Sequence, residues 1–226
     1  MPVYVFESID VIGAGRGELI EMVRSRWAPH LQEDYGVWLV GAWATAGSTA
    51  NWPEANALWE MDDWEHFARA QQARFPLEEK DAYGCELTRH SLRLRSGGRR
   101  SLLVGASFCP DRARIVAEGL AGPVILQETV VTRPGRRDEY LGALEGDYLP
   151  LARERGLALV GSYAHALRPN RAMNLWSYRS WEHVQEQMDA HPTDAALRGW
   201  ERRRDELLED TQGWLLAAPP AGMLRT

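Results

Sequence analysis

The stretch LWEMDDWEH at residues 58–66 decides the fold, because it returns as LWSYRSWEH at residues 175–183. Leu, two Trp, Glu and His recur at a constant offset of 117 positions, so that Trp59 matches Trp176 and His66 matches His183. Self-similarity of this kind is the sequence signature of a duplicated structural unit. The chain is therefore expected to contain two copies of one fold.

Each copy is surrounded by the same succession of hydrophobic periods. In the first half, strand-like runs and segments of helical spacing alternate in the order β-α-β-β-α-β. The four strand-like runs are residues 3–11, 37–44, 55–61 and 101–108, and Gly97-Gly98 is expected to end the second helical part. The second half repeats this order from residue 123. This is the ferredoxin-like order, in which helices cover one face of a four-stranded sheet.

The repeat predicts the domain organisation. We expect ferredoxin-like repeat 1 over residues 1–108, a connection over 109–122 and ferredoxin-like repeat 2 over 123–226. A sheet with helices on one face must bury its other face. The economical solution is an α+β fold with the two repeats packed sheet to sheet, as in a dimeric α/β-barrel. The residues leave open whether the halves pair within one chain or with those of a sister chain in a homodimer.

Composition and missing motifs exclude several classes of protein. The formal net charge of −6 argues against a nucleic acid or an anionic membrane as the main partner. Only Cys85 and Cys109 are present, without the Cys and His spacing of a metal site, so no metal is expected. No nucleotide-binding motif is present, so no cofactor is expected. With no signal peptide and no apolar run of about 18 residues, a cytoplasmic protein that crosses no membrane is expected.

The two repeats resemble the NIPSNAP family within the dimeric α/β-barrel superfamily. The resemblance rests on Leu-Val-Gly-x-Trp/Tyr at residues 39–43 and 159–163. It rests also on Leu-Trp followed by a helix-starting Asp or Ser at residues 58–63 and 175–180. It covers nearly all of both halves apart from the connection.

This resemblance implies a small-molecule pocket, either between helices and sheet or inside the barrel. The superfamily includes cofactor-free monooxygenases, polyketide cyclases, isomerases and haem enzymes. Ala57 and Asn174 stand where the NIPSNAP family tends to have a histidine. We expect cofactor-independent oxygenation, cyclisation or isomerisation of a hydrophobic aromatic or polyketide-like molecule in specialised metabolism. The alternatives are a non-catalytic small-molecule-binding or assembly protein and a haem-binding protein.

Four residues are candidates for proton transfer. Tyr163 and His165 lie two apart on one expected strand, where they could donate to a phenolic or enolic ligand and take a proton from it. Glu7 and Glu128 occupy equivalent strands among apolar residues, where a buried carboxylate needs a polar cavity or an arginine. The alternatives are a solvated strand end for His165 and, for the two glutamates, a structural ion pair with an arginine on the adjoining helix.

Seven further residues are candidates for substrate binding. Aromatic side chains would line the pocket and exclude water, although the repeated tryptophans are expected mainly to hold the core. Polar positions that differ between the halves suit a pocket that became asymmetric after duplication. The seven candidates are Trp38, Trp43, Trp59, Trp176, Glu60, Asn174 and Ser177. Strict strand alternation places Trp38 and Trp43 on opposite faces of their sheet.

The remaining histidines and the basic pairs are expected to have ordinary structural roles. His66 and His183 follow a helix start and should belong to a solvated first turn, while His90 lies on a helical stripe and should pack in the core. The alternative of haem binding would need His30, His90 or His165 as the axial ligand. The pair Arg99-Arg100 is expected on a solvated surface.

Overall fold

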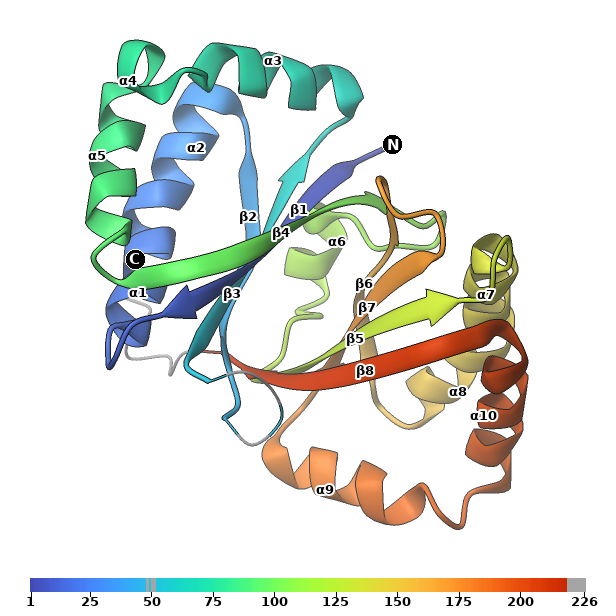
Figure 1. Cartoon of the computed structure of the whole chain (residues 1–226). Helices are drawn as coiled ribbons and strands as arrows, with labels where there is room; N and C mark the ends of the chain where they lie inside the picture. Colours follow the sequence, from blue (N-terminus) through green and yellow to red (C-terminus); the bar gives the residue numbers. More distant parts are fainter. Residues whose placement is uncertain (48, 50–51, 219–226) are drawn as a thin grey trace. The chain divides into compact units, whose positions relative to one another are not determined.

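The computed structural model describes residues 1–47, 49 and 52–218 (Figure 1). The chain divides into two compact units, unit 1 with Met1–Val104 and residues 217–218, and unit 2 with Gly105–Leu216. Each unit has the order β-α-β-β-α-β, with some helical parts in several pieces. The α+β class and the two ferredoxin-like repeats are confirmed.

Unit 1 forms one sheet in the strand order β4-β1-β3-β2, in which every neighbouring pair is antiparallel. Its strands are β1 Val3–Val11, β2 Trp38–Thr45, β3 Glu54–Met61 and β4 Arg95–Gly105. Its helices are α1 Arg16–Met22, the π-helix η1 Val23–Trp27, α2 Ala28–Tyr35, α3 Trp64–Arg74, α4 Leu77–Lys80 and α5 Ala82–Ser91.

Unit 2 repeats this arrangement with the strand order β8-β5-β7-β6. Its strands are β5 Val124–Thr132, β6 Ala158–His165, β7 Arg171–Tyr178 and β8 Leu208–Ala217. Its helices are α6 Arg112–Ala117, α7 Arg137–Ala143, the π-helix η2 Leu144–Tyr148, α8 Leu149–Glu154, α9 Trp181–Ala190 and α10 Ala195–Leu207. Helix α6 lies in the stretch expected as the connection.

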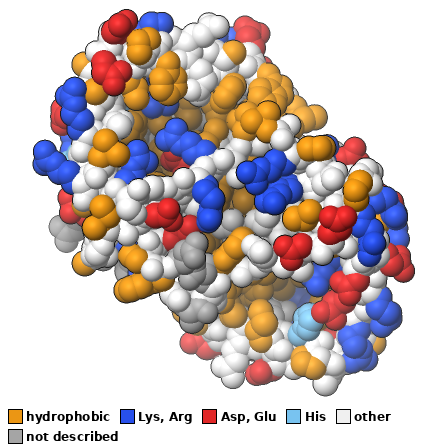
Figure 2. All heavy atoms as spheres, in the orientation of Figure 1, with side chains coloured by type: hydrophobic (Ala, Val, Ile, Leu, Met, Phe, Trp, Pro, Cys, Tyr) orange, Lys and Arg blue, Asp and Glu red, His pale blue; other side chains and the backbone are white. Residues whose placement is uncertain are grey.

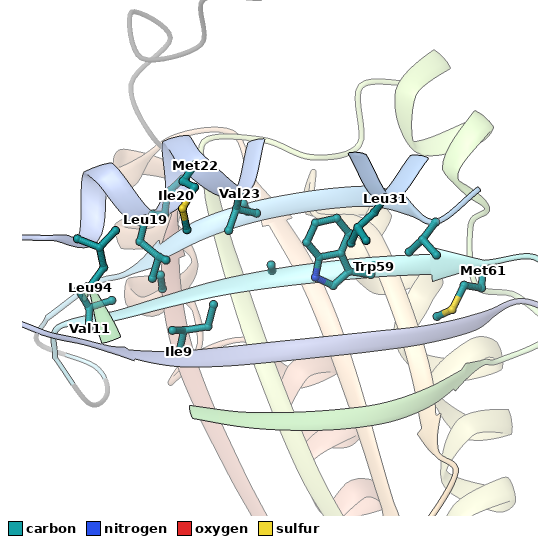
Figure 3. Packing of buried hydrophobic residues seen from close by; sticks show 14 of the residues in the cluster. Ile9, Val11, Leu19, Ile20, Met22, Val23, Leu31, Trp59, Met61 and Leu94 are labelled. Carbon is teal, nitrogen blue, oxygen red and sulfur yellow. The ribbon is translucent and has the colours of Figure 1, made fainter. Parts of the chain in front are cut away.

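The core of unit 1 lies between its first helical segment and its sheet. Figure 3 shows Leu19, Val23 and Leu31 from the helices pointing toward Ile9 and Trp59 on the strands. These apolar side chains leave water on folding, which contributes roughly 25 cal/mol per Å² of buried apolar surface. Since the apolar positions of the helix recur at helical spacing, this packing follows directly from the sequence pattern.

A π-helical turn occurs at the same place in both units, at Val23–Trp27 and Leu144–Tyr148. In each case a proline follows, Pro29 or Pro150, at the start of the next helical piece. Proline has no N–H to donate, so one hydrogen bond of the helix is missing there and the turn can widen. The helix continues beyond the irregular turn in both units.

The glycine-aromatic motif of the second strand has a packing explanation in both units. A Cβ at Gly41 would lie 2.2 Å from the Trp43 ring, and one at Gly161 would lie 1.9 Å from the Tyr163 hydroxyl. Each aromatic side chain therefore lies back over its own strand, which only glycine permits.

The expectation that Trp38 and Trp43 lie on opposite sheet faces is wrong. The β2–β3 register shifts between Leu39 and Gly41, so that Trp38 pairs with Glu60 and Trp43 pairs with Asn56. A bulge inserts one residue and reverses the alternation beyond it. Both tryptophans consequently lie on the face of the sheet that the unit 1 helices do not cover.

In each copy of the opening motif, the final Trp-Glu-His residues begin a helix. The histidine also contacts the end of the preceding helix. Asp63 and Ser180 cap α3 and α9 as expected, by accepting from the backbone N–H three residues on. The expectation of solvated histidines is wrong, because His66 and His183 are buried. Their Nε2 atoms lie 2.7 Å from the Tyr35 carbonyl and 2.9 Å from the Arg155 carbonyl, respectively.

Two further expectations in unit 1 are wrong. Gly97 and Gly98 do not end a helix but lie within β4, which begins at Arg95 and not at Ser101. His90 is not in the core, since its side chain is 38% exposed and contacts Glu18. In the described part of the chain, no helix is long and apolar enough to cross a membrane.

Candidate functional site

A cavity of about 260 Å³ lies between the helices and the sheet of unit 1. This is near the lower end of the range of ligand sites, about 300–1,000 Å³. Its inner wall is apolar, and polar side chains gather on one side. The apolar wall includes Val5, Ile9, Leu19, Val23, Trp27, Leu31, Trp59 and Met61, and the polar side consists of Glu7, Gln71, Arg74, Thr88, Ser91, Arg95 and Arg100.

Glu7 is the one carboxylate that lines this cavity among the described residues. It lies in the middle of β1, opposite Ala57 on β3 and Arg100 on β4. The Trp59 indole N–H donates to Glu7 Oε2 over 2.9 Å, and the Arg100 guanidinium forms an ion pair with Glu7 Oε1. A buried carboxylate is thus compensated by two donors and fixed at the boundary between the apolar wall and the polar side.

Arg74 enters the same cavity from the end of α3, and its partner is the buried Asp81. Arg74 Nε lies 3.6 Å from Asp81 Oδ2. Burial lowers the pKa of Arg74, and the Asp81 carboxylate opposes this shift. Asp81 also accepts from the Gly84 N–H over 2.7 Å and lies 2.9 Å from His30 Nε2. Asp81 therefore holds the Arg74 guanidinium at its Nε, and the Arg74 side chain lines the cavity.

A second hollow adjoins the cavity along β4. A groove of about 360 Å³ shares Glu7, Arg95 and Arg100 with the cavity and is lined also by Gly97 and Gly98. Gly97 and Gly98 place no side chain in this groove. Figure 2 shows a hollow above β4, with hydrophobic side chains inside it and Lys or Arg side chains along its rim.

In unit 2 the corresponding space holds large aromatic side chains. Tyr148 stacks on Trp200 with ring centroids 5.1 Å apart and meets Trp176 edge-on at 5.0 Å. Tyr140 lies beside Trp200 at 6.3 Å and is fully buried. Such aromatic pairs stabilise beyond the area they bury. The repeated tryptophan is thus core in unit 2, whereas Trp59 of unit 1 lines a cavity.

The second candidate carboxylate, Glu128, belongs to a polar network in unit 2. Asn174 Nδ2 donates to Glu128 Oε2 over 2.9 Å and to the Tyr140 hydroxyl over 2.8 Å, and Ser162 Oγ donates to Asn174 Oδ1 over 2.8 Å. Arg204 on α10 lies 3.6 Å from Glu128 Oε1. Burial raises the pKa of Tyr140 well above its ordinary value, and the Glu128 charge adds to this. Asn174 therefore links Glu128 on β5, Ser162 on β6 and Tyr140 on α7.

The pair Tyr163 and His165 lies in β6 of unit 2, and both residues are buried. The alternative of a solvated strand end for His165 is therefore wrong. Burial lowers the pKa of His165 to about 4, and the charges of Arg168, Arg171 and Arg137 contribute in the same direction. An imidazole with so low a pKa is neutral near pH 7 and is a weak general base.

The other binding candidates lie away from the unit 1 cavity. Trp43 is buried and Trp38 half-buried on the sheet face opposite the helices, where Glu60 pairs with Trp38. Ser177 Oγ accepts from the Gly122 N–H over 2.7 Å and so anchors the segment that enters β5. Of the proposed site residues, the structure brings together Glu7 and Trp59 at one cavity.

The histidines do not fit the haem alternative. His30 Nδ1 lies 2.8 Å from Asp34 and its Nε2 2.9 Å from Asp81, so both ring nitrogens already have carboxylate partners. His90 contacts Glu18 at the surface, and His165 is not among the residues that line the cavity. Among the described residues, no group of three or more His, Cys, Asp or Glu could hold a metal ion.

Sequence reasoning missed the arginines of the cavity. Arg100 was expected at the surface, and its side chain is 67% exposed, yet it pairs with Glu7. Arg74 and Arg95 were not singled out at all. The one available signal was the need of a mid-strand glutamate for a cationic partner, which points to an arginine but not to the strand register that supplies it.

No known protein family matches the chain, and no curated protein does. Solved structures are similar over its full length. A proposed monooxygenase from Lactobacillus acidophilus NCFM has a TM-score of 0.64 at 10% identity, covering 96% of this chain and 93% of that one. An anthrone oxidase-like protein has a TM-score of 0.61 at 10% identity, covering 96% and 91%. These likenesses show the fold, and the expected dimeric α/β-barrel class is confirmed.

NIPSNAP proteins are similar to part of the chain. A NIPSNAP family protein from Agrobacterium tumefaciens C58 covers 46% of this chain and 93% of its own length, at 20% identity and a TM-score of 0.39.

Proposed function

We propose that the chain is a cofactor-independent monooxygenase that oxidises an enolisable aromatic or polyketide-like molecule in the unit 1 cavity. The observation that carries this proposal is the place of Glu7, a compensated carboxylate at the boundary between an apolar wall and three arginines. The full-length likeness to a proposed monooxygenase and to an anthrone oxidase-like protein supports the same reaction class.

The first step is proton abstraction by Glu7 from an acidic C–H of the substrate. The Trp59 N–H and Arg100 hold the carboxylate in place, and the arginines at the cavity stabilise the negative charge that develops on the enolate oxygen. Cyclisation or isomerisation would begin with the same step. Glu7 is preferred to His165 as the base because Glu7 lines the cavity, whereas His165 does not.

Molecular oxygen then completes the reaction. The electron-rich carbanion is oxidised by O2, a C–O bond forms, and the peroxide takes the proton back from Glu7. The hydroperoxide loses water as its O–O bond and the second C–H bond break, which leaves a ketone. One O2 converts one CH2 group into C=O and one water. The apolar wall excludes bulk water from the carbanion.

Oxygen uptake tests this proposal. Purified protein is given 2-tetralone and its ring-hydroxylated analogues in an oxygen electrode, and the product and hydrogen peroxide are measured. These molecules have two fused rings and an enolisable CH2 group. We expect one O2 consumed per ketone formed, with no peroxide released. Glu7→Gln should lower the rate by about 10²–10⁴-fold, as for loss of a general base. Glu128→Gln is the matched control in unit 2 and should keep the rate of the folded protein.

Substrate binding without oxygen uptake would overturn the enzymatic proposal. The chain would then be a non-catalytic small-molecule-binding protein. An equal loss of rate in the Glu7→Gln and Glu128→Gln proteins, with both folded, would remove the assignment of the base to Glu7.

A further inference from the structure

We propose that the molecule bound in the unit 1 cavity is an organic anion, a carboxylate attached to one or two rings, and that Arg95 binds the carboxylate. This deepens the proposed function, on which it rests for the identity of the site.

The charges that line the cavity do not balance. Three arginines and one carboxylate contribute to its wall. Arg100 pairs with Glu7, and Arg74 lies 3.6 Å from the buried Asp81 behind the wall. Among the residues that the structure describes, Arg95 has no ion-pair or hydrogen-bond partner. One positive charge is therefore left over at the cavity.

The surroundings of Arg95 make this surplus costly in the empty protein. The side chain is at the start of β4 and is half-buried. Burial lowers its pKa, an effect that Glu7 opposes and Arg100 increases. A guanidinium taken partly out of water without a counter-ion is destabilised, and a carboxylate ligand would remove that cost. Its planar set of donors fits a carboxylate through two parallel hydrogen bonds.

Additional donors lie on the same side of the cavity. The Arg74 side chain lines the space, and its Nε, 3.6 Å from Asp81 Oδ2, makes no hydrogen bond in the described structure. The side chains of Thr88 and Ser91 on α5 also line the space. An anion with several acceptor lone pairs could use these groups together, whereas a neutral hydrocarbon would leave them unpaired.

The size of the cavity limits the rest of the ligand. A volume of about 260 Å³ is less than twice the 150 Å³ of an engineered apolar cavity that binds benzene. One ring or two fused rings fit this volume. Trp27 and Trp59 supply flat aromatic surfaces for such a body. The ligand class is therefore a small aromatic carboxylate.

A matched pair of ligands tests the proposal by titration calorimetry. The probes are 2-naphthoate and the neutral 2-naphthamide, which have nearly the same shape. We expect the wild-type protein to bind the carboxylate about 10- to 100-fold more tightly than the amide, as a charge-assisted pair requires. Arg95→Gln should abolish this preference, and Arg95→Lys should keep a part of it.

Arg99→Gln is the control variant. Arg99 is the neighbouring basic residue on β4 but pairs with Glu54, and it does not line the cavity. Its removal should leave both affinities within about twofold of wild type. Circular dichroism of each variant verifies the fold. If Arg95→Gln fails to fold, the ratio of the two affinities in wild type and in Arg95→Lys still tests the proposal.

Equal affinity for the two probes, or a preference that survives in folded Arg95→Gln, overturns the proposal. The outcome is independent of catalysis, because binding is measured without oxygen turnover. A carboxylate preference without oxygen uptake from any substrate leaves the anion site standing and removes the proposed oxygenation. Oxygen uptake with neutral substrates, together with equal affinity for the two probes, removes the anion site and leaves the proposed oxygenation standing.

Discussion

The helix–sheet space of the two units can be compared position by position. Leu94 and Leu207 are equivalent, since each carbonyl accepts from the residue that follows the first strand of its unit. Unit 1 then has Leu87 where unit 2 has Trp200. It has Ser91 where unit 2 has Arg204. Smaller side chains accompany the cavity of unit 1, and large aromatic ones occupy the same space in unit 2.

The carboxylate of the first strand shows what this difference does to function. In unit 2, Glu128 is bound by Asn174 and approached by Arg204 from a helix, inside a network that holds aromatic side chains. In unit 1, Glu7 is bound by Trp59 and Arg100 and faces a cavity. The same inherited carboxylate is thus a structural tie in one copy and accessible to a ligand in the other.

The largest expected effect comes from removing the aromatic stack of unit 2. Trp200→Ala deletes a ring that packs on Tyr148 and Tyr140, and we expect it to lower the free energy of unfolding by about 3–5 kcal/mol. Urea unfolding followed by circular dichroism measures this. Trp200→Phe retains an aromatic ring and should lose less than half as much. A loss below about 1 kcal/mol for Trp200→Ala would show that the stack is not the core of unit 2.

The fold could be predicted from the sequence because its information is local and was duplicated. The repeated tryptophan marks the third strand, and Asp63 and Ser180 cap the next helix as their side-chain chemistry indicates. The bulge that moves Trp38 to the face of Trp43 could not be predicted. It depends on the pairing of β2 with β3, and a one-residue shift reverses every later side chain.

The candidate site could be predicted only in part, for the same reason. Glu7 was identified because a glutamate within an apolar strand needs compensation. Its partner Arg100 is supplied by the register of β1 with β4, which no local pattern encodes. Arg95 stood in a segment expected to be helical, and the glycines after it were taken for a helix end. Tertiary pairing, which local propensity does not determine, placed the cavity arginines.

Filling the cavity of unit 1 should make it more like unit 2. Leu19 lines the cavity at the position of Tyr140 in unit 2. Leu19→Phe adds a ring there without a hydroxyl that would need a partner. We expect the affinity for 2-naphthoate to fall at least about tenfold, equivalent to roughly 1.4 kcal/mol, with unfolding free energy within about 1 kcal/mol of wild type.

Leu19→Met is the control for this exchange, because it conserves volume and should keep the affinity. Wild-type affinity in a folded Leu19→Phe protein would contradict the placement of the ligand against α1. Calorimetry and urea unfolding of the same preparations separate a blocked cavity from a damaged fold.

The smallest expected effect concerns the last residue of the second strand, which is Thr45 in β2 of unit 1 and His165 in β6 of unit 2. Burial lowers the folded-state pKa of His165 to about 4, whereas the unfolded value is near 6.5. Between these values the unfolded chain binds a proton that the folded chain excludes, so stability falls as pH decreases. Relative to His165→Thr, wild type should lose about 1 kcal/mol from pH 7 to pH 4, after allowance for solvent screening. Urea unfolding of both proteins across this range measures the difference, and parallel curves would show that His165 is as readily protonated in the fold as outside it.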